Sequence, residues 1–269
     1  MYAVSRKPGR HITLSVVADI AKFLILVIIL TWLMVRGSER LGYNWQWYMV
    51  PRYIFSTDNG RLVAGPLLDG LLVTLSITAY SMLLAFLCGL VTALLRLSNS
   101  IIGRIVARGY LEFIRNTPLL VQIFFIYFVL APVLDINRFT SAVLALSLFE
   151  GAYASEIFRA GIVSIHKEQW EAAYSTGLST YQAYRFVILP QAIRWMLPPL
   201  TGQAVSLVKD SALVSTIAIY DLTMQGQAII AETFLTFEIW FTVAAIYFLL
   251  TVTLSFGVGL LENRFRTPT

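Results

Sequence analysis

Charged residues are scarce in this sequence. Asp, Glu, Lys and Arg make up 13% of its 269 residues, about half of the roughly 25% that soluble domains carry. Hydrophobic residues make up 58%, and the mean hydropathy is +0.73. A chain of this length cannot hide so much apolar surface in one water-soluble core. The composition therefore excludes an ordinary soluble domain and predicts an integral membrane protein.

Residues that build metal and redox sites are also few. Cys88 is the one cysteine and lies in an apolar run, so neither a disulfide framework nor a thiolate cluster can form. His11 and His166 are the two histidines, and neither has a second metal ligand in sight. No stretch matches the P-loop pattern GxxxxGK followed by Ser or Thr, so this chain does not bind ATP in that way. We expect no cofactor in this chain.

Long apolar runs predict an all-α integral membrane protein with about six transmembrane helices, since about 20 mostly apolar residues cross the hydrocarbon core. The runs cover about residues 16–35, 71–95, 119–134, 139–165, 197–219 and 239–261. The first follows a basic segment, as a secretory signal would, but no small-x-small cleavage site follows it. We therefore interpret it as a retained anchor. The aromatic-rich segment after it, with Trp45 and Trp47, is typical of a lipid–water interface.

Basic residues gather in alternate loops of this arrangement. They precede the first span, separate the second from the third, flank the loop after the fourth and follow the sixth: Arg6, Lys7, Arg10, Arg96, Arg104, Arg108, Arg115, Arg159, Lys167, Arg185, Arg194, Arg264 and Arg266. Lys and Arg accumulate in cytoplasmic loops. Both termini and the loop after the fourth span are therefore predicted to be cytoplasmic. The net charge of +5 then reflects topology and not nucleic-acid binding.

The loop after the fourth span, at about 164–196, has the sequence signals of two short helices. Ser164 is a candidate N-cap for the first, and Gly177 suits the left-handed residue that ends it. Ser179 and Gln182 have capping-box spacing for the second, which Pro190 and the Pro198–Pro199 pair are expected to end. A folded loop rich in small residues implies close docking against a partner.

Four motifs in this chain resemble those of bacterial ABC importer permeases of the polar amino acid branch, related to the histidine, glutamine and arginine systems. The first is EAA at Glu171–Ala173, followed by Gly177 and by Val187–Pro190, where the family usually has Ile in place of Val187. The other three are FIRNTPLLVQIFF, GAYASEIFRAGI and LVKDSALVSTI, which begin at Phe113, Gly151 and Leu207. The resemblance covers about residues 70–265, and the motifs fall in the family's order.

The resemblance implies that residues 66–269 form an importer transmembrane domain, preceded by an extension at 1–65 with one extra transmembrane helix. In that family the loop at about 164–196 is a coupling helix that fits a groove on a cytoplasmic ATP-binding subunit. Helix-in-groove docking explains the small residues, which allow close backbone approach. The implied coupling residues are Glu171, Ala172, Ala173, Gly177, Leu189 and Pro190.

The resemblance also implies the partners. They are cytoplasmic ATP-binding subunits, which would hold ATP and Mg, a second permease subunit, identical or homologous, an extracytoplasmic solute-binding protein, the amino acid substrate and membrane lipid. The chain itself would be a transport subunit of the bacterial inner membrane and not an enzyme. Hydrolysis would take place on the separate ATPase.

Other readings of the loop and of the chain have weaker support. Two short helices joined at Gly177 resemble a helix-turn-helix DNA reader, but Glu168 and Glu171 oppose phosphate contact. An amphipathic loop resting on the membrane surface stays open as an alternative. An ion-gradient-driven secondary transporter commonly shows a repeated pair of halves, which is not evident here. A membrane enzyme would need a cluster of His, Asp or Ser groups, and none is evident.

Three ionisable residues lie within predicted spans, where charges are costly and usually mark a function. Glu150 lies near the middle of the fourth span, and Lys209 and Asp210 near the middle of the fifth. Adjacent helical residues point about 100° apart, so Lys209 and Asp210 cannot simply neutralise each other. Our hypothesis is that Lys209 pairs with Glu150, while Asp210 faces the substrate path and meets an amino acid's ammonium group. A single buried structural network of all three remains the alternative.

Overall fold

The computed structural model describes residues 11–58 and 61–265. Contacts divide the chain into two units, Met1–Gln46 and Trp47–Thr269. The basic residues predicted to precede the first span, Arg6, Lys7 and Arg10, lie outside the described residues, as does Arg266.

The described part of the first unit, from residue 11 onward, contains a single helix, α1 (His11–Leu41). Its segment Ala18–Gly37 is long and apolar enough to cross a membrane. Lys22 pairs with Asp19 within it at 3.1 Å, and the Arg36 guanidinium lies 4.7 Å from the Trp32 ring centre. The predicted first span is thus confirmed as an apolar helix of spanning length.

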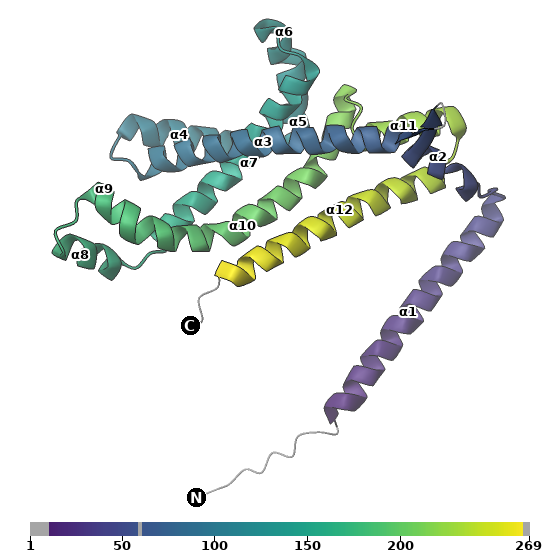
Figure 1. The fold of residues 1–269 in the computed structure, drawn as a ribbon, viewed down its shortest axis with the longest axis horizontal. Coiled ribbons are helices and arrows are strands. Elements are labelled where there is room, and N and C mark those ends of the chain that lie inside the picture. Colours follow the sequence, from purple (N-terminus) through teal and green to yellow (C-terminus); the bar gives the residue numbers. More distant parts are fainter. Residues whose placement is uncertain (1–10, 59–60, 266–269) are drawn as a thin grey trace, which may run out of the picture. The chain divides into compact units, whose positions relative to one another are not determined.

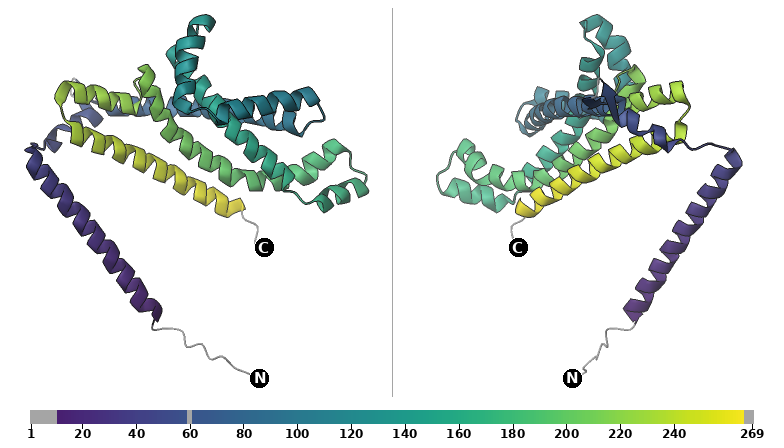
Figure 2. Two further views of the ribbon diagram at one scale, coloured as in Figure 1. Left: turned by 180° about the vertical axis from the view of Figure 1, so that it is seen from behind. Right: turned by 45° about the vertical axis from the view of Figure 1, so that its right-hand side comes forward.

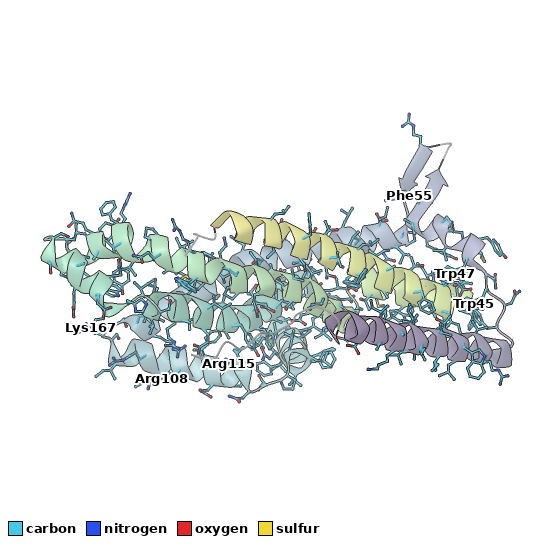
Figure 3. All side chains as sticks on the ribbon, turned by 90° about the horizontal axis from the view of Figure 1, so that it is seen from below. Trp45, Trp47, Phe55, Arg108, Arg115 and Lys167 are labelled. Carbon is cyan, nitrogen blue, oxygen red and sulfur yellow. The ribbon has the colours of Figure 1, made fainter. Side chains whose placement is uncertain are left out.

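The second unit is helical apart from one hairpin. The short helices η1 (Trp47–Met49) and α2 (Pro51–Ile54) come first. They are followed by an antiparallel pair, β1 (Phe55–Asp58) and β2 (Arg61–Ala64), in which Phe55 is opposite Ala64. Figure 3 shows this hairpin projecting from the helices.

The helices that follow comprise the body of the unit and the α8–α9 loop. They are α3 (Pro66–Leu97), α4 (Ile101–Arg115), α5 (Leu119–Phe124), the π-helix η2 (Phe125–Leu130), α6 (Ala131–Leu134), α7 (Arg138–Val163), α8 (Lys167–Ser175), α9 (Thr180–Ala183), the π-helix η3 (Tyr184–Ile188), α10 (Leu189–Asp210), the 3-10 helix η4 (Ser211–Ile217), α11 (Leu222–Thr233) and α12 (Thr236–Phe265).

The centre of the body is the pair α3 and α7, which lie side by side (Figure 1). Small residues bring their backbones together, as they do in membrane helix pairs. A Cβ on Gly89 of α3 would lie 2.8 Å from the Cβ of Ala154, so no larger residue fits there. Ser81 also donates a hydrogen bond to the Val143 carbonyl at 3.4 Å. The helices α4 and α10 each pack against both members of this pair.

Four helices of the described residues are long and apolar enough to cross a membrane, namely the α1 segment, α3, α7 and the Thr236–Leu260 part of α12. A fifth is obtained if α4 and the Leu119–Leu134 segment count as one span, although they are bent by 108°. The predicted fifth span at 197–219 is helical but does not qualify, because α10 carries Arg194, Gln203, Lys209 and Asp210. The all-α membrane fold is confirmed, with fewer apolar spans than the expected six.

Two π-helical turns precede prolines. The η2 turn ends just before Ala131–Pro132, and η3 ends just before Leu189–Pro190. Proline has no N–H and its ring crowds the preceding turn of an α-helix, and a wider turn relieves that crowding. The helical path from Thr180 therefore continues to Ile217. The prediction that Pro190 and Pro198–Pro199 end the second loop helix is wrong, because Pro198 and Pro199 lie inside α10.

Candidate functional site

The loop between α7 and α10 begins differently from the prediction. The residue before α8 is His166, not Ser164. Ser164 ends α7, and its hydroxyl donates to the Gly161 carbonyl at 2.9 Å. Its assignment as an N-cap is therefore wrong, because α7 continues to Val163 and the Ser164 side chain bonds back to its own last turn.

Gly177 ends α8 as the sequence predicts. Its φ is +79°, in the left-handed region. The Gly177 N–H donates to the Tyr174 carbonyl at 3.0 Å, and the Leu178 N–H to the Ala173 carbonyl at 3.2 Å. These two bonds together form a Schellman motif. The reversal of the chain after α8 therefore depends on a backbone conformation that glycine adopts without strain.

The second loop helix starts with the expected capping box. The Ser179 side chain accepts a bond from the Gln182 N–H at 3.4 Å, and the Gln182 side chain accepts one from the Ser179 N–H at 2.9 Å. Two backbone donors at the start of α9 are satisfied reciprocally. The turn from Gly177 to Ser179 is thus specified by local sequence.

Aromatic packing fixes the loop to the body. The Trp170 ring of α8 meets the Tyr184 ring of η3 edge-on, with 4.8 Å between the ring centres. Both rings pack against a core cluster that includes Phe158 of α7 and Ile188 of η3. The Gln191 side chain donates to that of Gln169 at 3.2 Å. The loop is therefore a folded extension of α7 and α10 and is packed against both helices.

The structure sorts the six predicted coupling residues by exposure. Five are exposed, namely Glu171, Ala172, Gly177, Leu189 and Pro190. Ala173 is only 4% exposed and faces the body, so its small size serves packing within the subunit. The Glu171 carboxylate pairs with Lys167 at 2.9 Å on the surface of α8.

Sequence reasoning missed three exposed aromatic side chains on the same loop. They are Tyr174, Tyr181 and Phe186, with exposed fractions of 47%, 68% and 63%. Large aromatic residues are enriched at the centres of protein interfaces. Their occurrence in an otherwise polar loop was the signal that could have identified them.

A second candidate site lies between α7 and α10. Glu150 of α7 is 1% exposed, and the side chains of Gln203 and Asp210 approach it from α10. Neither oxygen of Glu150 completes a hydrogen bond of normal length to another group in the described residues. A buried carboxyl group without a partner is costly. The two unpartnered oxygens make this cluster a candidate binding site for a hydrogen-bond donor.

Lys209 does not take the place that the sequence hypothesis gave it. Its side chain is exposed, and no carboxylate of the described residues lies within ion-pair distance of it. The α10 face toward α7 is that of Gln203, Leu207 and Asp210, at i, i+4 and i+7. The expected Lys209–Glu150 pair is thus corrected, because helical spacing turns Asp210 toward Glu150 and Lys209 away. The same spacing could have identified Gln203.

An ion-pair cluster holds three helices together near the ends of α3 and α4. The Glu156 Oε1 atom lies 2.7 Å from Arg96 Nη1 of α3 and 3.2 Å from Arg115 Nη1 of α4. Its Oε2 atom lies 3.3 Å from Arg159 Nε, one turn along α7. One carboxylate thus serves three guanidinium groups, and it fixes the corner after which the chain turns into α5.

We expect Glu156→Gln to lower the unfolding temperature of the purified chain, because three guanidinium groups, two of them on half-buried residues, would lose their common counter-ion. The free energy of unfolding should fall by about 1–3 kcal/mol, which lies between the values typical of exposed and of buried ion pairs. Thermal unfolding in detergent measures it. Arg159→Gln is the control, since it removes one partner of three, and an equal loss in both variants would contradict a central role for Glu156.

Comparisons with known proteins identify relatives over most of the chain. Residues 85–267 match the family described as binding-protein-dependent transport system inner membrane component. The chain is 41% identical over 203 residues to the glutamine transport system permease protein GlnP of Escherichia coli K12, covering 74% of this chain and 93% of that protein. It is 40% identical over 203 residues to the L-cystine transport system permease protein TcyB of Bacillus subtilis strain 168, covering 74% and 86%.

A solved structure agrees with both relatives. It is the crystal structure of an amino acid ABC transporter with histidines, one chain of which matches with a TM-score of 0.70 and 40% sequence identity. The match covers 74% of this chain and 94% of that one. The fold and the sequence therefore point to the same group of membrane proteins.

Proposed function

This chain belongs to the family of binding-protein-dependent transport system inner membrane components, and from that premise we propose how its loop and its buried cluster serve the import of a polar amino acid. It is a multi-pass permease subunit of an ABC importer of the inner membrane. Membership implies an ATP-binding subunit and a solute-binding protein, and it favours ATP-driven import over secondary transport driven by an ion gradient.

The proposed dock for the ATP-binding subunit is the outer face of the α8–α9 loop. Support comes from its rigid attachment to α7 and α10, from the exposed Ala172 and Gly177, and from the exposed ring of Tyr181. Small residues permit close approach of a groove, and aromatic rings supply the buried area. ATP and Mg would be held by that partner, and the chain itself would catalyse no reaction. The loop and both termini would then lie in the cytoplasm.

The proposed cargo site is the Glu150, Gln203 and Asp210 cluster. Its two carboxyl groups lie close to each other, and no Lys or Arg of the described residues lies within ion-pair distance of either, which is the observation that carries the proposal. An α-ammonium group would supply the missing donors, since charge-assisted hydrogen bonds are the strong ones. The Gln203 amide can both donate and accept, so it suits a polar side chain. A second permease subunit, identical or homologous, would complete the path.

Uptake of labelled glutamine tests the cargo proposal. Proteoliposomes would contain the assembled importer and its solute-binding protein, with ATP inside or omitted. We expect ATP-dependent accumulation that excess unlabelled glutamine abolishes. An analogue in which hydrogen replaces the α-amino group should compete poorly, because it cannot satisfy the two carboxyl groups. ATP-dependent uptake of a non-amino-acid solute alone would contradict the amino acid assignment while leaving the permease function intact.

A further inference from the structure

The surface of α4 is divided into three sectors. Gly103, Ala107, Leu111 and Ile114 are buried against the body. Ile102, Ile105, Val106 and Phe113 form an apolar sector and are 59–76% exposed. Successive residues of an α-helix are rotated by about 100°, so Arg104, Arg108 and Arg115 fall in a third sector between the other two. One helix thus presents a basic stripe and an exposed apolar stripe on neighbouring faces, with the exposed Glu112 at the border between Arg108 and Ile105.

The two arginines nearest the start of α4 form no ion pair in the part of the chain that the structure describes, and the nearby Glu112 accepts a hydrogen bond from Asn116 instead. No carboxylate of the described residues lies within ion-pair distance of Arg104 or Arg108. Arg115, further along the stripe, is already engaged with Glu156. Like charges at i and i+4 repel each other on a helix. An anion between Arg104 and Arg108 would remove that repulsion.

The start of α4 adds to the positive potential. The first turn contains no acidic residue, and the Ser100 side chain satisfies only the Gly103 N–H. The remaining N–H groups and the helix dipole favour negative charge at this end. The α4 N-terminus therefore carries an uncompensated positive charge from two independent sources, the arginines and the backbone.

The position of the basic stripe on α4 suits the binding of a lipid headgroup. The α3–α4 turn lies at the same end of the unit as α8 and α9 in all views (Figures 1 and 2). Helical side chains lean toward the helix N-terminus, so Arg108 reaches back toward that end. Arg108 lies at the outer edge of the unit in Figure 3. Ile105 and Val106 lie one turn further along α4 than Ile101 and Ile102, away from that end.

We propose that Arg104 and Arg108 bind the phosphate of an anionic phospholipid, whose acyl chains lie along Ile105, Val106 and Phe113. Basic sites on the cytoplasmic side of membrane proteins recognise such headgroups. The assignment to the cytoplasmic leaflet depends on the proposed function, whereas the binding itself does not. A free phosphate ion would use the guanidinium groups only, and the apolar stripe distinguishes a lipid from it.

Native mass spectrometry of the full chain with phosphatidylglycerol and phosphatidylcholine in equal amounts tests the proposal. Each arginine near an anionic headgroup contributes about fivefold in affinity, so Arg104→Gln with Arg108→Gln should lower phosphatidylglycerol binding about thirtyfold. Phosphatidylcholine binding should hardly change. The matched control, Arg52→Gln with Arg61→Gln, makes the same change in net charge at the other end of the unit and should leave both unaffected.

Two further measurements close the test. The double variant Arg104→Lys with Arg108→Lys keeps both positive charges, so it should retain most of the phosphatidylglycerol binding. That result would show that the loss of binding in the Gln double variant is not caused by misfolding. Inorganic phosphate in millimolar excess should not displace phosphatidylglycerol. Equal lipid preference in the Gln variant and the unmodified chain, or full displacement by phosphate, would overturn the proposal. Unchanged lipid preference with loss of subunit assembly would likewise overturn it, in favour of a protein partner.

Discussion

Replacing Gly177 with valine is expected to impair both ATP-driven uptake and association with the ATP-binding subunit, while leaving the chain in the membrane. A β-branched residue is strained in the left-handed region, by roughly 1–2 kcal/mol or more. The Schellman bonds to the Tyr174 and Ala173 carbonyls would then break or distort. The direction in which α8 leaves the loop would change, so uptake should fall at least about tenfold, the equivalent of about 1.4 kcal/mol. Uptake in proteoliposomes measures the loss of transport, and copurification of the ATP-binding subunit measures whether that subunit still associates.

Gly177→Asn separates backbone strain from close approach. Asparagine tolerates the left-handed conformation, and a Cβ at Gly177 meets no atom of this subunit within 4 Å. If the asparagine variant loses association with the ATP-binding subunit, as is expected of the valine variant, the partner contacts this position closely. If Asn supports full uptake, only the conformation matters. Survival of both association and uptake in the valine variant would show that the coupling assignment is wrong.

Neutralising the buried cluster is expected to produce the second large effect. A hydrogen bond to a charged group contributes about 1.5–3 kcal/mol, so Asp210→Asn or Glu150→Gln should raise the KM for uptake about 10- to 150-fold. Both substitutions preserve side-chain shape. The amount of assembled importer, measured by copurification of its subunits, should not change.

Stability distinguishes this substrate site from a structural network. Glu150 is buried and completes no hydrogen bond, so its conversion to Gln should leave the unfolding temperature unchanged or raise it. Such sites are often conserved at a cost in stability. Lys209→Gln is the control, because Lys209 points away from the cluster and should change neither KM nor stability strongly. A large loss of unfolding temperature in all three variants would favour the structural alternative.

The local features of this protein follow from its sequence alone. The left-handed turn at Gly177 and the Ser179–Gln182 capping box each involve only a few neighbouring residues. The types of those residues are therefore enough to specify both features. Apolar runs likewise predict α3, α7 and α12, because the hydrocarbon core sets the required length and composition. The same reasoning fails at Ser164. Serine suits the start of a helix, but here α7 continues to Val163 and Ser164 lies at its end.

Only the tertiary structure decided which charged groups meet. The rotation of α10 against α7 turns Asp210 toward Glu150 and leaves Lys209 exposed. The buried position of Ala173 and the three guanidinium groups around Glu156 also depend on packing between distant segments. Sequence spacing fixes directions within one helix, whereas the contacts between helices depend on how whole side-chain surfaces fit together.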